Sequence, residues 1–74
     1  MRAATDLAPH EVAVISGFAD MVVAGRLMAM GVMPHSQIEL IRRNALGYTL
    51  IFRVGSRFKI ALRRDEAQTI YVVD

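Results

Sequence analysis

The stretch Ala24–Pro34 constrains the fold of this chain most, because it indicates a helix with a defined end. Val23, Leu27 and Met30 recur at helical spacing and therefore share one face of that helix. Gly25 in the interior costs about 1 kcal/mol relative to alanine, so helix propensity alone does not hold the segment together. We therefore expect the helix to dock on a sheet formed by the rest of the chain.

Both ends of this helix carry recognisable signals. Asp20 can accept a hydrogen bond from the first free backbone N–H groups and is the expected N-cap. Gly31 stands where a left-handed residue ends a helix, and Pro34 cannot continue one. The helix is thus predicted to start after Asp20 and to stop near Gly31.

Short segments that alternate apolar and polar residues make up most of the remaining chain. Residues 57–63 alternate most regularly, with Phe58, Ile60 and Leu62 expected to face inward. Strands are predicted at Glu11–Ile15, with Val12 and Val14 on one face, and at Gln37–Arg43, Tyr48–Val54, Arg57–Arg63 and Thr69–Val73. The other residues expected to face inward are Ile38, Leu40, Leu50, Phe52, Val54, Ile70 and Val72.

The connections between these strands are short. Ser16-Gly17 is expected to end the first strand, and Asn44–Gly47 and Gly55-Ser56 have the composition of hairpin turns. Short, closely spaced strands favour a small barrel, and closure also removes edges that would promote aggregation. We predict a mainly β protein: a single domain over residues 1–74, an SH3-like barrel of about five strands with a short helix between the first and second.

Composition limits what holds this domain together and where it acts. The 74 residues include no cysteine, so neither a disulfide nor a thiolate metal site contributes, whereas 54% hydrophobic residues permit an apolar core. The longest uncharged run, Leu27–Ile38, is shorter than the roughly 20 residues of a membrane-spanning helix. The first residues also lack the apolar centre of a signal peptide. We therefore expect a cytoplasmic protein.

Several segments together resemble one family. Arg26–Pro34 is similar to the pattern R-L-x-x-(L/M)-G-(hydrophobic)-x-P-G of FeoA, the small cytoplasmic component of bacterial ferrous iron transport. Ala45-Leu46-Gly47 resembles the hairpin of that family, and Ile60–Ala67 resembles its segment before the last strand. The resemblance extends from Leu7 to Val73. His10 and His35 depart from it, because the family usually has glycine there, and Tyr48-Thr49 replaces the usual Asp-Pro.

The resemblance implies an SH3-like barrel that works beside FeoB, the membrane ferrous iron permease with a cytoplasmic GTPase domain. The expected function is that of an accessory or regulatory protein that binds the cytoplasmic part of this permease. We predict a partner-binding surface at the helix and its exit, where methionines are adaptable apolar contacts. Its residues are Arg26, Leu27, Met28, Met30 and Met33.

Leu27 is the position on which this prediction depends most, since it heads the signature and Arg26 beside it can bind a carboxylate. The hypothesis predicts that Leu27→Arg leaves the barrel folded and abolishes association with the permease. Methionine also fills irregular core gaps, and for the segment as a whole this interpretation carries equal weight.

Enzymatic chemistry and metal binding find little support. Neither common glycine-rich phosphate loop is present, and Asp65-Glu66 is best interpreted as a solvated turn in which Glu66 caps a short helix. His10 and His35, with Glu11 or Asp6 nearby, are candidate metal ligands, but they lack the spacing of a metal site and are interpreted as exposed turn residues. No enzyme, cofactor or metal site is predicted.

Basic residues gather on the predicted outward faces of the strands. They are Arg42, Arg43, Arg53, Arg57, Lys59, Arg63 and Arg64. This stripe supports an alternative function: a nucleic-acid-binding small barrel, or a stand-alone equivalent of the SH3-like domain of an iron-responsive repressor. A solvated face is the favoured interpretation, because Phe52 and Phe58 are expected to face inward and leave mainly Tyr48 and Tyr71 for stacking. An acidic lipid or the cytoplasmic domain of the transporter is a further alternative partner for this basic face.

Overall fold

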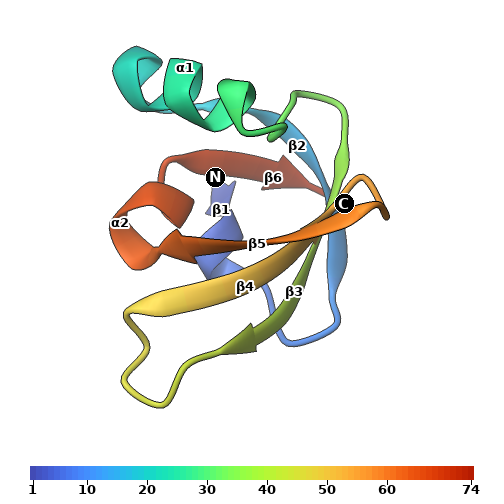
Figure 1. Ribbon diagram of the computed structural model, residues 1–74. Coiled ribbons are helices and arrows are strands. Elements are labelled where there is room, and N and C mark those ends of the chain that lie inside the picture. Colours follow the sequence, from blue (N-terminus) through green and yellow to red (C-terminus); the bar gives the residue numbers. More distant parts are fainter.

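The computed structural model describes residues 1–74 and consists of one curled antiparallel sheet with short helices beside it (Figure 1). The sheet has six strands in the order β1-β6-β2-β3-β4-β5. The strands are β1 (Arg2–Ala3), β2 (Val12–Phe18), β3 (Gln37–Arg43), β4 (Thr49–Val54), β5 (Phe58–Arg63) and β6 (Ile70–Val73). The helices are the 3₁₀ turn η1 (Ala4–Asp6), α1 (Met21–Ala29) and α2 (Arg64–Ala67). The predicted mainly β architecture is confirmed. The helix expected between the first and second of about five strands lies between β2 and β3, because the two-residue β1 is an additional strand.

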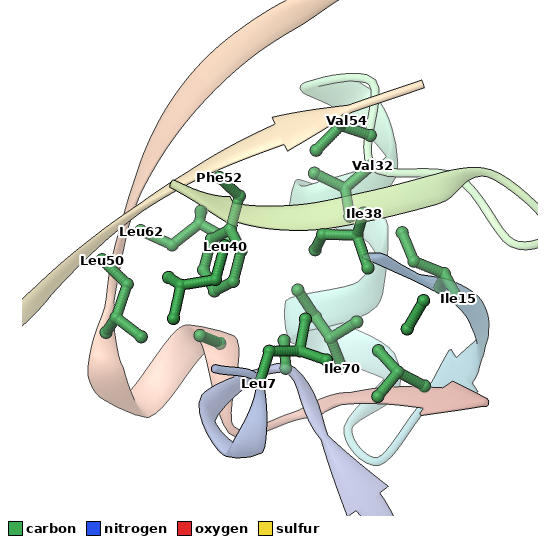
Figure 2. Close-up of a cluster of buried hydrophobic side chains, with 14 of the residues drawn as sticks. Leu7, Ile15, Val32, Ile38, Leu40, Leu50, Phe52, Val54, Leu62 and Ile70 are labelled. Carbon is green, nitrogen blue, oxygen red and sulfur yellow. The ribbon is translucent and has the colours of Figure 1, made fainter. Parts of the chain in front are cut away.

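The core beneath the curled sheet is entirely apolar. All 17 buried residues are hydrophobic, and Phe52 is the largest of the fully buried side chains. Figure 2 shows side chains from β2, β3, β4 and β6 converging with Leu7 and Val32. The alternation predicted for β3 and β4 is confirmed, because every residue expected inward there is buried: Ile38, Leu40, Leu50, Phe52 and Val54.

A bulge in β3 explains why its pattern is imperfect. The pairing with β4 shifts register between Leu40 and Arg42, so Ile41 is the additional residue. A bulge leaves one residue unpaired and increases the local twist. Ile41, which interrupts the alternation in the sequence, is half-buried there.

Strand β2 is longer than predicted. It continues through Ser16 and Gly17 to Phe18, because a bulge between Ile15 and Gly17 lets it stay paired with β6. Its buried residues are Ala13 and Ile15, whereas Val12 is 49% exposed. Pairing with β3 and β6, rather than side-chain volume, therefore decides which face of this strand is inside.

The first residues of the chain belong to the sheet. Arg2 and Ala3 pair with Val72 and Tyr71 of β6. The Arg2 guanidinium lies 2.9 Å from a Glu11 carboxylate oxygen and 3.0 Å from Asp74 Oδ1. These contacts hold both chain ends together at one margin of the sheet.

Glu11 is fixed from two sides at this margin. Its carboxylate accepts a hydrogen bond from the Ala8 N–H at 2.9 Å and another from Arg2 at 3.0 Å. The hydrogen bond from Ala8, followed by that from Arg2, lowers the pKa of Glu11 below its ordinary value of 4.5. The ionised form of Glu11 therefore favours the folded state.

The barrel has a seam that strand pairing does not close. No pairing joins β1 to β5, so these strands are the two edges of the sheet, and the expectation of an edge-free cylinder is wrong here. The reason is that β1 ends after two residues, where the chain turns into η1 and Asp6 Oδ2 accepts a hydrogen bond from Ala3 N–H at 2.9 Å. Helix α2 contacts η1 across this seam.

Candidate functional site

Helix α1 begins as its sequence predicts. Asp20 has an extended backbone, and its Oδ1 accepts hydrogen bonds from Val22 N–H at 2.9 Å and Val23 N–H at 3.2 Å. These two bonds satisfy donors that a helix start otherwise leaves free. The cap sets the helix start at Met21, so Met21 and Val22 lie in the first turn.

The end of α1 is a Schellman motif. Val32 N–H donates to Leu27 O and Gly31 N–H donates to Met28 O, both at 3.0 Å. Gly31 has φ +97°, and a Cβ added to it would lie 2.8 Å from Phe58 Cζ. Glycine is therefore required at position 31 both by the backbone conformation and by the ring that packs over it.

Phe58 is the aromatic residue that differs from prediction. It was expected in the core, but its side chain lies over Gly31 at the end of α1 and the residue is 37% exposed. Of the three residues predicted inward on β5, Leu62 is buried and Ile60 is half-buried. The inward face of β5 thus ends in a contact with the helix rather than in the barrel.

Leu27 lies in the core, which corrects its predicted role in partner contact. Its relative exposure is 0%, as is that of Val32. In a Schellman motif the residues at these two positions commonly make an apolar contact, and both belong here to the buried cluster. An arginine at position 27 would be a buried charge without a partner, so Leu27→Arg would unfold the domain instead of testing binding.

Apart from Arg26, the outward face of α1 is apolar, which is unusual for a helix at the surface. Met21 is 79% exposed, Val22 is 85% exposed and Met30 is 44% exposed. Gly25 and Ala29 are also exposed between them. A surface helix normally presents polar residues to water, and one that is hydrophobic on all sides is normally covered. We call the residues Met21, Val22, Gly25, Ala29, Met30 and Met33 the α1 surface.

The other predicted contact residues divide into three groups. Met33 is 45% exposed beyond the helix end and Met28 is half-buried. Arg26 Nη2 lies 3.5 Å from Glu66 Oε2, so this guanidinium joins α1 to α2. Arg26, Met30 and Met33 are therefore the three of the five that are exposed, although the Arg26 guanidinium is engaged by Glu66. The prediction missed Met21 and Val22, although the N-cap at Asp20 sets the start of the helix and thereby their phase.

One shallow cavity lies away from α1, between the start of β4 and α2. Its volume is about 450 Å³, and it is lined by Tyr48, Thr49, Arg63, Arg64, Asp65 and Gln68. Glu66, expected to cap α2, accepts a hydrogen bond from Arg63 N–H at 2.9 Å. Asp65 lies 3.8 Å from Arg63 Nε, and its Oδ1 accepts from Glu66 N–H. The two carboxylates therefore have structural contacts of their own.

Comparison with known proteins identifies the family. A model of the FeoA domain matches residues 4–74. The chain belongs to the FeoA family. No curated protein sequence matches the chain.

Solved structures of FeoA proteins have the same fold. FeoA from Chlorobium tepidum is 25% identical with a TM-score of 0.83, covering 96% of this chain and 68% of that one. FeoA from Stenotrophomonas maltophilia, solved with zinc, is 24% identical with a TM-score of 0.84, covering 99% and 91%. That protein is described as an SH3 domain protein proposed to act as a bacterial ferrous iron transport activating factor. The predicted SH3-like fold is confirmed.

The same fold is found in a different class of protein. A manganese-dependent transcriptional repressor in complex with manganese is 18% identical with a TM-score of 0.87. The match covers 97% of this chain and 35% of the repressor chain. At this identity the likeness concerns the fold alone.

The two histidines at FeoA glycine positions occupy turns with positive φ. His10 has φ +70° and His35 has φ +72°, a conformation that glycine adopts without strain. His10 Nδ1 lies 3.7 Å from Glu39 Oε2, and no group of three or more potential metal ligands occurs in the chain.

Neither helix has the length and apolar character needed to cross a membrane.

Proposed function

We propose that this FeoA-family chain is a cytoplasmic accessory protein of ferrous iron uptake that binds the cytoplasmic part of a FeoB-like permease. Membership of the FeoA family supports the connection to iron transport. The description of the S. maltophilia protein as a proposed transport activating factor supports an accessory function. In this proposal the chain acts by binding and not by catalysis, and it needs no cofactor or metal of its own.

The observation that carries the proposal is the apolar outward face of α1. Met21 and Val22 are among the most exposed hydrophobic side chains, and no charged side chain lies on the helix except Arg26. Contiguous exposed apolar residues on a small protein indicate a contact with another molecule. Methionine suits such a contact, because its unbranched side chain adapts to the shape of a partner.

Gly25 gives this surface a second property. It lies at the centre of the exposed face, and an added Cβ there would meet nothing within 4 Å. A glycine that costs helix stability without serving the packing of its own domain permits a partner to approach the helix backbone closely. We infer that the partner contacts α1 around Gly25.

Exposed substitutions on α1 test the proposal without disturbing the core. Val22→Asp changes a residue that is 85% exposed, and an acidic residue in the first turn is compatible with the helix dipole. The matched control is Leu46→Asp, which adds the same charge at a residue 77% exposed in the β3–β4 loop. This loop lies at the opposite end of the molecule from α1 (Figure 1).

The measurement is the affinity of each purified variant for the purified cytoplasmic portion of a FeoB-like permease. We expect Val22→Asp to weaken binding at least tenfold, as truncation of an interface anchor does, and Leu46→Asp to leave it unchanged. Both variants should keep the melting temperature of the parent. Equal binding by the two variants would exclude the α1 surface as the contact.

A further inference from the structure

Strand β5 is an open edge of the sheet. It pairs with β4 only, and the hydrogen bond from Arg64 N–H to Tyr48 O at 2.9 Å fixes which residues point toward β4. Hydrogen-bonded and non-hydrogen-bonded residue pairs alternate along an antiparallel ladder. The backbone N–H and C=O groups of residues 58, 60 and 62 therefore point toward β4, whereas those of residues 59, 61 and 63 point away from the sheet.

Two of the three outward residues have free backbone groups. The Arg63 N–H donates to Glu66 Oε1 at 2.9 Å, so α2 covers that end of the edge. The N–H and C=O groups of Lys59 and Ala61 have no backbone partner, and both residues are exposed. An edge with this pattern can pair with a further strand.

The edge lies in the most basic part of the chain. Residues 40–64 contain seven of the nine lysines and arginines and none of the seven aspartates and glutamates. Arg53 is the cross-strand neighbour of Lys59, and the nearest carboxylate, Glu39, is 4.0 Å from Arg53. Lys59 and Arg57 form no ion pair at all. Arg63, by contrast, lies 3.6 Å from a Glu66 oxygen and 3.8 Å from an Asp65 oxygen, so an occupant of this edge would meet uncompensated positive charge at Lys59 and Arg57.

We propose that the β5 edge binds an extended acidic segment of another protein by strand addition. The backbone of the segment pairs with the free groups of Lys59 and Ala61, and its carboxylates contact Lys59 and Arg57. This surface differs from the α1 surface, and the proposal does not depend on the identity of the permease.

A peptide fits this site better than the other anionic occupants. Strand addition uses backbone donors and acceptors in register, which a nucleic acid does not have, and single-stranded nucleic acid needs aromatic side chains for stacking. Phe52 is buried, Phe18 and Tyr71 are half-buried, and Phe58 covers Gly31. Tyr48, 68% exposed, is therefore the aromatic residue most open to a base. A second copy of this chain is unsuited, because pairing β5 with β5 would place Lys59 and its neighbours against like charges.

The test is an NMR titration of the ¹⁵N-labelled protein with a capped ten-residue peptide of alternating glutamate and threonine. Binding by strand addition should shift the Lys59 and Ala61 amide signals and slow their hydrogen exchange at least tenfold. Lys59→Glu should weaken binding at least tenfold. Arg42→Glu, an identical charge change at an exposed and unpaired residue of β3, should leave the affinity within about twofold.

Ala61→Pro separates strand addition from charge attraction. Proline removes an N–H that bonds to nothing in this structure, and edge strands tolerate proline where the N–H faces solvent. We expect at least tenfold weaker binding by this variant at an unchanged net charge. Equal weakening by Lys59→Glu and Arg42→Glu, unchanged amide exchange at Lys59 and Ala61, or tighter binding of an oligouridine of equal charge would each overturn the proposal.

Discussion

Replacing Gly25 with alanine should stabilise the domain and weaken its contact with the permease. Gly25 lies in the middle of α1, and a Cβ there would meet no other atom within 4 Å. Alanine is favoured over glycine in a helix interior by about 1 kcal/mol. With an unfolding entropy of about 2.1 cal/mol/K per residue, a chain of 74 residues gains about 6 °C in melting temperature.

Thermal and urea unfolding measure the first effect, and affinity for the cytoplasmic portion of a FeoB-like permease measures the second. Gly47→Ala is the matched control, because the same methyl group at φ +75° should destabilise the domain by about 1 kcal/mol or more. A loss of stability in Gly25→Ala would refute the exposed helix face on which the proposed function depends. A gain in stability with unchanged affinity would refute close approach of the partner at Gly25. The rest of the α1 surface would then still be tested by Val22→Asp.

Two further predictions concern the turns and the N-terminal ion pairs. His35→Gly should raise the free energy of unfolding by about 0.5–1 kcal/mol, because relief of the strain at φ +72° exceeds the entropy cost of glycine. His35→Ala, the control, should not raise the stability. A loss of stability in His35→Gly would contradict the turn geometry. The lowered pKa of Glu11 stabilises the fold above pH 4.5, and this contribution disappears as the pH falls through the folded-state pKa. Urea unfolding between pH 7 and pH 3 should therefore show that Glu11→Gln is less stable than the parent at neutral pH only. A difference in unfolding free energy that does not change with pH would show that ionisation of Glu11 is not the cause.

Local patterns predicted most of the sheet and the two ends of α1. Alternation identified the inward residues of β3 and β4, because one side of these strands is buried and a one-residue shift would expose every core side chain. Asp20 and Gly31 marked the helix, because each satisfies a backbone requirement that few residue types meet. Such signals depend on neighbours in the chain and can therefore be recognised in the sequence.

The prediction that Leu27 contacts the partner failed because two local arguments conflicted. Val23, Leu27 and Met30 share a helical face that must dock on the sheet, so Leu27 could not also be the principal partner contact. The structure resolves the conflict by burying Leu27, whereas Met30 is the C-cap and is 44% exposed. Met21 and Val22, on the side of the helix away from Leu27, also remain exposed.

Features that depend on distant pairing could not be predicted from local patterns. The orientation of β2 follows from its pairing with β3 and β6, and β1 exists because Arg2 and Ala3 pair with the far end of the chain. Phe58 fits the alternation of β5, yet it packs on Gly31, which is 27 positions earlier in the sequence. The exposed β5 edge likewise follows from the early end of β1.

The pairing of β1 with β6 has a consequence for protein architecture. It brings the first and last residues to the same margin, where Arg2 and Asp74 are 3.0 Å apart. Entry and exit at neighbouring points let a fold be inserted into a longer polypeptide through two short connections, without rearranging the host. Joining Asp74 to Met1 through a brief linker and opening the chain in the Asn44–Gly47 loop should therefore produce a circular permutant with the same barrel.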